Sequence, residues 1–384
     1  MFYQTLILFA NILTGVVITR SSNYGVRANI SSLTAWLGFS LIILNQSHFE
    51  NIIRNKINFA RHDYFLRAFP ILIFSCLTTI ALETTFWIFP LVFFYMFLNT
   101  LVQFSGAKFF VSNGNVSFLM FSLVFYIVNL IQTLVLILID SLNIYTWLFA
   151  SIVADLILLT LYMFFSKGSE PIFLRPNREY HLKFSIAAVF FALADPMVVI
   201  IANHFSDAES LAYFVVAIST VSPILIIYSA FQNSLLAFPN KVKLNFMYFK
   251  VVSFLFLLIL SVFSYTFLIK HAIPIVFGER YLQLTNHALL IVLMGFLMLT
   301  FKVSNTIMRS LDHSFHSISL TFTFLTSFTF CCVYVSESKV SLILSTVLSL
   351  SMSLALLGIG LIFKAAFRQF QTYKNTLFNC SNRP

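Results

Sequence analysis

Long apolar runs, separated by short polar connections, make up most of the chain. Each run is long enough for a helix that rises about 1.5 Å per residue to cross a hydrocarbon core about 30 Å thick. A continuous apolar run of this length is typical of a transmembrane helix. The pattern predicts about twelve such helices, at residues 2–19, 28–46, 66–82, 85–104, 116–139, 145–165, 182–202, 210–231, 247–269, 287–308, 317–336 and 340–363.

Composition points to the same class. The chain is 59% hydrophobic and only 9% charged, and its mean hydropathy is +0.92. These values exclude a soluble domain and predict an all-α polytopic membrane protein. The four cysteines have neither disulfide nor zinc spacing, so we expect no metal and no cofactor.

Basic residues predict the orientation in the membrane. When the helices are threaded with the N-terminus in the cytoplasm, 18 of the 23 Lys and Arg residues fall on the cytoplasmic side and 5 on the other. The positive-inside rule then predicts that both termini are cytoplasmic. We interpret the net charge of +10 as topology and attraction to anionic lipid headgroups, not as nucleic-acid binding. We expect the first apolar run to be retained rather than cleaved as a signal peptide.

A polar linker divides the chain into two halves of similar length. Residues 166–181 contain Gly168, Pro171 and Pro176 together with basic residues, which is typical of a connection rather than a helix. The predicted organisation is an N-terminal six-helix lobe (1–165), a cytoplasmic linker (166–181), a C-terminal six-helix lobe (182–364) and a cytoplasmic tail (365–384). Because each lobe has an even number of spans, the two lobes would have the same orientation.

Asp195 is the least expected residue in the seventh run, where it lies near mid-membrane and precedes Pro196. A carboxylate at that depth is costly and should face protein or a water-filled cavity, which indicates a functional site. Pro196 removes a helix hydrogen bond and favours a kink in a helix that lines a cavity. The alternative is a structural, hydrogen-bonded Asp195. No intramembrane Lys or Arg is obviously placed to neutralise this acid.

Asp155 is a second acid in mid-membrane, ten residues from each end of its run. A buried carboxyl group can exchange a proton or an ion when a conformational change alters its hydration, so Asp155 and Asp195 are both candidates for ion coupling. Asn129 and Gln132 in the fifth run could hydrogen-bond one of these acids or a sugar. They could equally serve only to hold helices together.

Three stretches carry a resemblance to a known family. The first run ends in Ile18–Gly25, with Arg20 followed by a short loop that contains a glycine. The seventh and eighth runs contain Ala194-Asp195-Pro196 and end at Ala237-Phe238-Pro239, and the ninth is followed by the segment Ile275–Tyr281. In these features the chain resembles the bacterial polysaccharide or O-antigen (lipopolysaccharide) flippases, the Wzx-type members of the multidrug/oligosaccharidyl-lipid/polysaccharide (MOP) superfamily.

The resemblance implies a function. Such flippases move an undecaprenyl-diphosphate-linked oligosaccharide across the bacterial inner membrane, with two lobes rocking around a central cavity in alternating access. Arg20 matches the family position, and Arg67, Lys302 and Arg309 become candidates for capturing the diphosphate from the cytoplasm, because cationic side chains bind phosphate. Asp195 is the further substrate-binding candidate. Each basic residue could instead be an interfacial anchor.

Other functions share parts of this pattern. A drug or metabolite exporter of the same superfamily would have the same twelve spans. A membrane polysaccharide polymerase is disfavoured because the outer loops are short and hold no acid and histidine in a catalytic arrangement, so we expect no enzyme. The expected partners are the lipid-linked oligosaccharide, membrane lipids and the polysaccharide polymerase machinery, with no nucleic acid.

Overall fold

The structure is a computed structural model, and it describes residues 2–55, 68–82, 86–113, 115–165, 178–237, 264–310, 314–334 and 341–358. These residues form helices joined by short turns, and none of them forms a strand. The N-terminal lobe contains α1 (Phe2–Ser21), α2 (Tyr24–Asn55), α4 (Ala68–Ala81), a short 3-10 turn at Phe86–Ile88, α5 (Phe89–Asn113), α6 (Asn115–Leu138) and α7 (Ile144–Phe165).

Among the described residues, the C-terminal lobe has the same number of α-helices as the N-terminal lobe. It contains α8 (Arg178–Phe205), α9 (Ala208–Ala237), a helix at Ser264–Phe277, the 3-10 segment η3 (Glu279–His287), α11 (Ala288–Ser310), α12 (Ser314–Tyr334) and a last helix at Ser341–Gly358. Each of the twelve expected apolar runs overlaps one helix, which confirms the predicted fold class. Within the described residues, nine helices are long and apolar enough to cross a membrane.

Helix boundaries differ from the expected runs in two places. α2 continues to Asn55, nine residues beyond the expected end, and α8 begins at Arg178, inside the range predicted to be linker. Both extensions are polar, and a helix that is already nucleated continues at little cost into such flanking residues. The rest of the linker (166–177) and the predicted tail (365–384) lie outside the described residues, as does most of the ninth expected run.

The largest apolar cluster is built mainly from the C-terminal lobe and also includes Ala28 of α2, while a second cluster lies within the N-terminal lobe. In the N-terminal lobe α5 packs on α7 and α1 on α6, and Leu33, Met96 and Leu148 are among the fully buried side chains. In the C-terminal lobe α11 packs on α9 and α12 on α8. At Gly295 of α11 an added Cβ would lie 2.8 Å from the Cβ of Val221, so α11 and α9 approach more closely than any larger residue allows.

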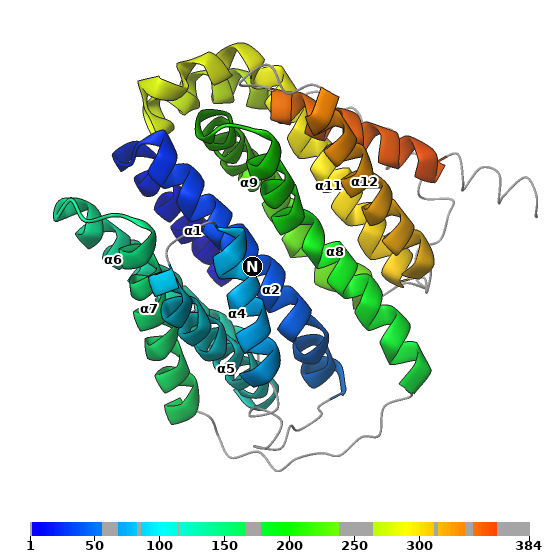
Figure 1. Ribbon diagram of the computed structural model, residues 1–384. Coiled ribbons are helices and arrows are strands. Elements are labelled where there is room, and N and C mark those ends of the chain that lie inside the picture. The colour runs from blue at the N-terminus through cyan, green and yellow to red at the C-terminus, as the bar shows by residue number, and fades with distance from the viewer. Residues whose placement is uncertain are drawn as a thin grey trace, which may run out of the picture.

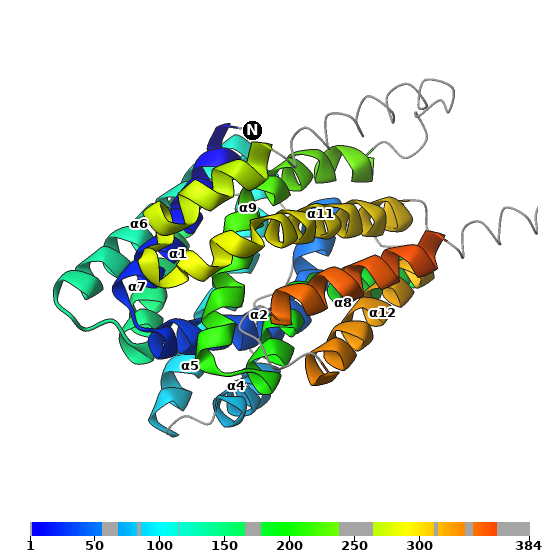
Figure 2. The same cartoon turned by 90° about the horizontal axis from the view of Figure 1, so that it is seen from above.

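Four helices form the main contact between the two lobes. α2 packs against α8 and α9 of the other lobe, and α1 also contacts α9 (Figure 1). Gly38 of α2 lies opposite Pro196 of α8, where an added Cβ would be 3.8 Å from the proline Cβ. Figure 2 shows α6 and α7 at one side of the molecule and α11 and α12 toward the other, with α2 and α9 between them.

The outer surface is apolar, as a lipid-facing surface requires. Only 6% of the most apolar window of α6, Ser117–Leu138, is buried inside the protein, although its mean hydropathy is 2.3. Large exposed side chains such as Phe69, Trp87 and Phe315 extend this surface around both lobes. In water such a surface would aggregate, whereas in a bilayer it is solvated by acyl chains.

Candidate functional site

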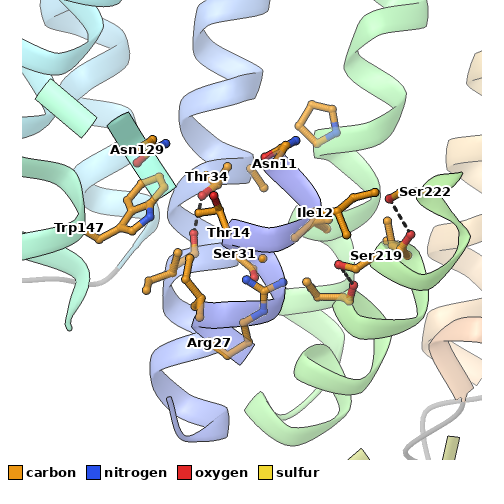
Figure 3. Close-up of a pocket in the computed structure, with 18 residues that line it drawn as sticks. Asn11, Ile12, Thr14, Arg27, Ser31, Thr34, Asn129, Trp147, Ser219 and Ser222 are labelled. Atoms are coloured by element: carbon orange, nitrogen blue, oxygen red, sulfur yellow. Dashed lines mark hydrogen bonds between the residues drawn. The ribbon is translucent and has the colours of Figure 1, made fainter. Parts of the chain in front are cut away.

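A cavity of about 410 Å³ lies between the lobes, and we call it the central cavity (Figure 3). Helices α1, α2, α6 and α7 of the N-terminal lobe and α8 and α9 of the C-terminal lobe contribute to its wall. The residues that line it are Asn11, Ile12, Thr14, Gly15, Ile18, Arg27, Ile30, Ser31, Thr34, Ala35, Asn129, Trp147, Pro196, Val199, Val215, Ile218, Ser219 and Ser222.

Arg27 is the single charged residue in this wall, and local sequence explains its position. Asn23 caps the start of α2, because its side-chain oxygen accepts a hydrogen bond from the backbone N–H of Val26 at 2.8 Å. The helix therefore begins before the expected apolar run, and Arg27 lies one turn inside it. The guanidinium packs over Gly15 of α1, where an added Cβ would be 3.8 Å from an Arg27 terminal nitrogen.

Three buried polar atoms in the central cavity have no hydrogen-bond partner. They are Nε of Arg27, Oδ1 of Asn129 and Nε1 of Trp147, and Arg27 as a whole is only 6% exposed. An unpaired buried donor or acceptor costs about 1–3 kcal/mol, so three that line one cavity indicate a place for a polar ligand or water. The set combines a cation, an amide acceptor and an aromatic N–H donor.

Hydroxyl groups complete the wall. The side chains of Thr14, Thr34, Ser219 and Ser222 donate to the carbonyl oxygen four residues earlier in their own helices. Their lone pairs therefore remain able to accept hydrogen bonds from a ligand. The cavity can hold an anionic group beside Arg27 and hydroxyl groups around it.

Aromatic and polar contacts join the lobes at the end of the molecule where α1 meets α2. The hydroxyl groups of Tyr24 and Tyr213 both donate to the carbonyl oxygen of Arg280, at 3.3 and 2.7 Å, and the Arg280 guanidinium donates to the carbonyl oxygen of Ser22 at 3.1 Å. The ring centroids of Tyr24, Tyr213 and Tyr281 lie 5.3 to 6.0 Å apart. We call these five residues the interlobe clasp.

The clasp closes the lobes against each other one helical turn from Arg27, because Tyr24 and Arg27 are three residues apart on α2. Gly278, which precedes η3, has a φ of 98° that a residue with a side chain rarely adopts. The turn at Gly278 positions Arg280 of η3 within the interlobe clasp. The segment Ile275–Tyr281, noted above for its family resemblance, thus forms part of the contact between lobes.

Asp195 is paired with a lysine, contrary to expectation. Nζ of Lys302 on α11 lies 2.5 Å from Oδ2 of Asp195 on α8. The expectation that no intramembrane Lys or Arg neutralises this acid is therefore wrong. Lys302 lies fourteen residues after Ala288, the first residue of α11, and eight residues before Ser310, its last.

Asp155 is 1% exposed and lies inside the N-terminal lobe, away from the central cavity. Its Oδ2 accepts a hydrogen bond from Asn99 of α5 at 3.1 Å, and Gln103 in turn donates to Asn99 at 2.9 Å. Its Oδ1 has no hydrogen-bond partner. The structure separates Asp155 from Asp195, which belongs to the other lobe.

The basic residues singled out in the sequence lie in different places. Arg20 is exposed in the last turn of α1 and is absent from the wall of the central cavity. Arg67 lies outside the described residues, and Arg309 belongs to the last turn of α11. Asn129 does line the central cavity, whereas Gln132 lines an apolar groove between α5, α6 and α7. Arg27 is not among the residues singled out in the sequence, although Asn23, a residue that often caps helices, could have indicated that Arg27 lies inside a helix.

Comparison with known proteins identifies the fold. The chain resembles a MATE transporter crystallised in complex with MaD3S, with a TM-score of 0.55 and 13% identity over 96% of this chain and 95% of that one. It also resembles the outward-facing conformation of a multidrug resistance MATE family transporter of the MOP superfamily, with a TM-score of 0.52 and 13% identity over 95% and 93% of the two chains.

A third structure with this fold is a MOP superfamily transporter from Pyrococcus furiosus Vc1 (DSM3638), described by the reverse polarity of its binding pocket. It has a TM-score of 0.51 and 12% identity over 93% of this chain and 92% of that one. No family model matches the sequence, and no curated protein matches it. The chain thus has the polytopic fold of MATE transporters, and the proteins that share this fold are transporters rather than enzymes.

Proposed function

We propose that the protein is a transporter that moves a lipid-linked, anionic oligosaccharide, such as one carried on undecaprenyl diphosphate, across the membrane by alternating access. The observation that carries this proposal is Arg27, a buried cation with an unpaired Nε in the wall of the cavity between the lobes. A permanently charged guanidinium in that position favours an anionic ligand, and its planar fork matches the oxygens of a phosphate group.

Charge separates this proposal from its main alternative. A drug exporter of the same superfamily would have the same fold, and the resemblance to MATE transporters agrees equally well with that function. A cationic drug would have to enter a cavity whose described wall contains one positive residue and no acid. Each unit of like charge placed about 4 Å from Arg27 would cost several kcal/mol at an effective dielectric constant near 20.

The other unpaired atoms fit a sugar. Oδ1 of Asn129 can accept a hydrogen bond from a sugar hydroxyl, and Nε1 of Trp147 can donate one. The hydroxyl groups of Ser219 and Ser222 supply acceptors from the opposite lobe. The lipid tail of such a substrate would remain in the bilayer while the diphosphate and sugar occupy the polar cavity.

Alternating access fits the arrangement of the lobes. Solved structures with this fold include transporters in outward-facing and in inward-facing conformations. The interlobe clasp is built from a few hydrogen bonds and ring contacts, which a transporter can break and remake during its cycle. We also propose that the protein lies in the bacterial inner membrane, as the family resemblance implies, with both termini in the cytoplasm, as the distribution of basic residues predicts. A polysaccharide polymerase would use the product on the opposite side of the membrane.

The proposal is tested by transport in proteoliposomes, with undecaprenyl-diphosphate-linked oligosaccharide as the probe. Arg27→Gln removes the charge while it keeps a polar side chain, and we expect transport to fall by about 10- to 100-fold, since a hydrogen bond to a charged group contributes about 1.5–3 kcal/mol. Arg27→Lys should retain an intermediate rate, because lysine keeps the charge but loses the fork.

Two further variants control for general loss of positive charge. Lys270→Gln removes an exposed cation outside the central cavity and should leave transport unchanged. Arg20→Gln should have a smaller effect than Arg27→Gln, because Arg20 is exposed on α1. The proposal would be wrong if Arg27→Gln kept full transport activity. It would also be wrong, and a drug exporter favoured, if the wild-type protein transported ethidium but not the lipid-linked probe.

A further inference from the structure

A groove of about 560 Å³ lies between α5, α6 and α7 in the N-terminal lobe. Its wall includes Ile131, Val135 and Phe149, which are 54%, 49% and 60% exposed, so the groove opens toward the outside of the lobe. In a membrane this outside is the bilayer, and Figure 2 shows α6 and α7 at one side of the molecule. None of the residues in this wall lines the central cavity. We call it the lateral groove.

Gln132 gives the lateral groove an unsatisfied hydrogen-bond acceptor. Seven of the ten lining residues are apolar, and the others are Gln132, Tyr145 and Thr146. Oε1 of Gln132 is buried and has no hydrogen-bond partner. The Thr146 hydroxyl is already engaged, because it donates to the carbonyl oxygen of Ser141 at 2.6 Å and accepts from the backbone N–H of Asn143 at 3.0 Å. The groove thus combines an apolar wall with an acceptor that lacks a donor.

A water molecule alone fits beside Gln132 poorly. Gln132 lies six residues before the end of α6 at Leu138, or about 9 Å along the helix, whereas Tyr145 and Thr146 lie in the first turn of α7. A buried water makes roughly two to four hydrogen bonds, and the wall away from that turn is otherwise apolar. A hydroxyl group on an apolar chain needs only the one acceptor, because the chain is solvated by the apolar wall.

The charges around the lateral groove disfavour a lipid with a phosphate group. None of the lining residues is charged. Asp140 is exposed in the turn that joins α6 to α7, and backbone hydrogen bonds from Asp140 to Ile137 and from Ser141 to Leu136 fix this turn at the end of the groove. An anionic headgroup would meet a like charge there, and carrying that charge to the depth of Gln132 would cost far more than burying a hydroxyl group.

We propose that the lateral groove binds an uncharged lipid that carries a hydroxyl group. The hydroxyl donates a hydrogen bond to Oε1 of Gln132, and the apolar chain lies along α6 and α7. The wall on α7 runs from Tyr145 to Val153, about 12 Å of helix, so it contacts a chain rather than a headgroup. The proposal concerns this groove alone and does not rest on the proposed function.

Binding in the lateral groove bears on the central cavity through shared helices. On α6, Gln132 follows Asn129 by three residues, and on α7, Ala150 follows Trp147 by three. Asn129 and Trp147 carry two of the unpaired polar atoms of the central cavity. A lipid that bridges α6 and α7 therefore holds in place the two segments that present these atoms to a substrate.

The test is competition for photolabelling of the purified protein in phosphatidylcholine nanodiscs. The probe is dodecanol with a diazirine in its chain, and labelled peptides are located by mass spectrometry. The competitors share one chain and differ in the head: 1-dodecanol, methyl dodecyl ether, which has no donor, and dodecyl phosphate, which is anionic. We expect labelling of the groove residues on α6 and α7, and half-competition by dodecanol at a concentration about fivefold lower than by the ether, which corresponds to a hydrogen bond of about 1 kcal/mol. Dodecyl phosphate should compete no better than the ether.

Matched variants identify the acceptor. Gln132→Leu should make dodecanol and the ether compete equally, whereas Leu134→Ala, which changes an exposed side chain of α6 outside the groove, should keep the fivefold preference. If Gln132→Leu does not fold, the comparison of the three competitors on the wild-type protein decides. Equal competition by dodecanol and the ether, strongest competition by dodecyl phosphate, or a preference for dodecanol that survives in Gln132→Leu would each overturn the proposal.

Discussion

The ion pair between Asp195 and Lys302 can be tested by removing its charges one at a time and then together. Asp195→Asn and Lys302→Gln each change a charged group to a polar one of similar length. Each single variant leaves the other charge without its partner, in a helix of membrane-spanning length. The double variant leaves no charge at all, so it should be more stable than the two single effects predict by addition.

The expected size of the coupling follows from the exposure of the two side chains. Exposed ion pairs contribute about 0.2–1 kcal/mol, and breaking a buried pair costs about 3–5 kcal/mol. The Lys302 side chain is 16% exposed and that of Asp195 is 58% exposed, so the pair falls between these limits. We expect a coupling free energy of about 1–2 kcal/mol, well above the ~0.5 kcal/mol scatter of independent sites.

The assay is equilibrium unfolding of the four proteins in lipid nanodiscs, combined with the amount of each variant in the membrane. A charge-reversed protein, Asp195→Lys with Lys302→Asp, should recover part of the stability that either reversal alone removes. Additive effects of Asp195→Asn and Lys302→Gln within ~0.3 kcal/mol would refute the reasoning and show that the two charges do not depend on each other. Transport by the same variants is a second readout. If Asp195 acts in transport through this pair, Asp195→Asn and Lys302→Gln should lower the transport rate to a similar extent.

Two further predictions concern the packing and the clasp. Gly295→Ala should lower the free energy of unfolding by about 1–3 kcal/mol, because its Cβ would lie 2.8 Å from a side chain of α9, whereas Gly358→Ala, with no atom within 4 Å, should have no such cost in the same unfolding assay. Arg280→Ala removes a hydrogen bond between the lobes, so a cysteine placed at Ser31 in the central cavity should react several-fold faster with a thiol reagent added from the side of the clasp. An unchanged labelling rate would indicate that the clasp does not hold that end closed.

Local information was sufficient to predict the helices. Runs such as 116–139 and 145–165 are apolar enough to be helical wherever they pack, since a membrane leaves the backbone no other partner than itself. The unusual depth of Asp155 and Asp195 was likewise visible in the sequence. Helix ends were harder to predict, because the cap at Asn23 and the polar extension at Arg178 lie outside the apolar runs.

What surrounds each polar residue depends on helices that are distant in sequence. Arg20 and Arg27 are only seven residues apart, yet Arg27 is buried in the wall of the central cavity, over Gly15 of α1, and Arg20 is exposed. Asp195 and Lys302 are 107 residues apart and meet only because α8 and α11 lie in the same lobe. The sequence by itself determined the membrane-spanning helices and the acids within them, because the free energy of burial in lipid depends on each segment alone. The pairing of charges was decided by tertiary packing, because the sequence of one helix does not specify which distant helix packs against it.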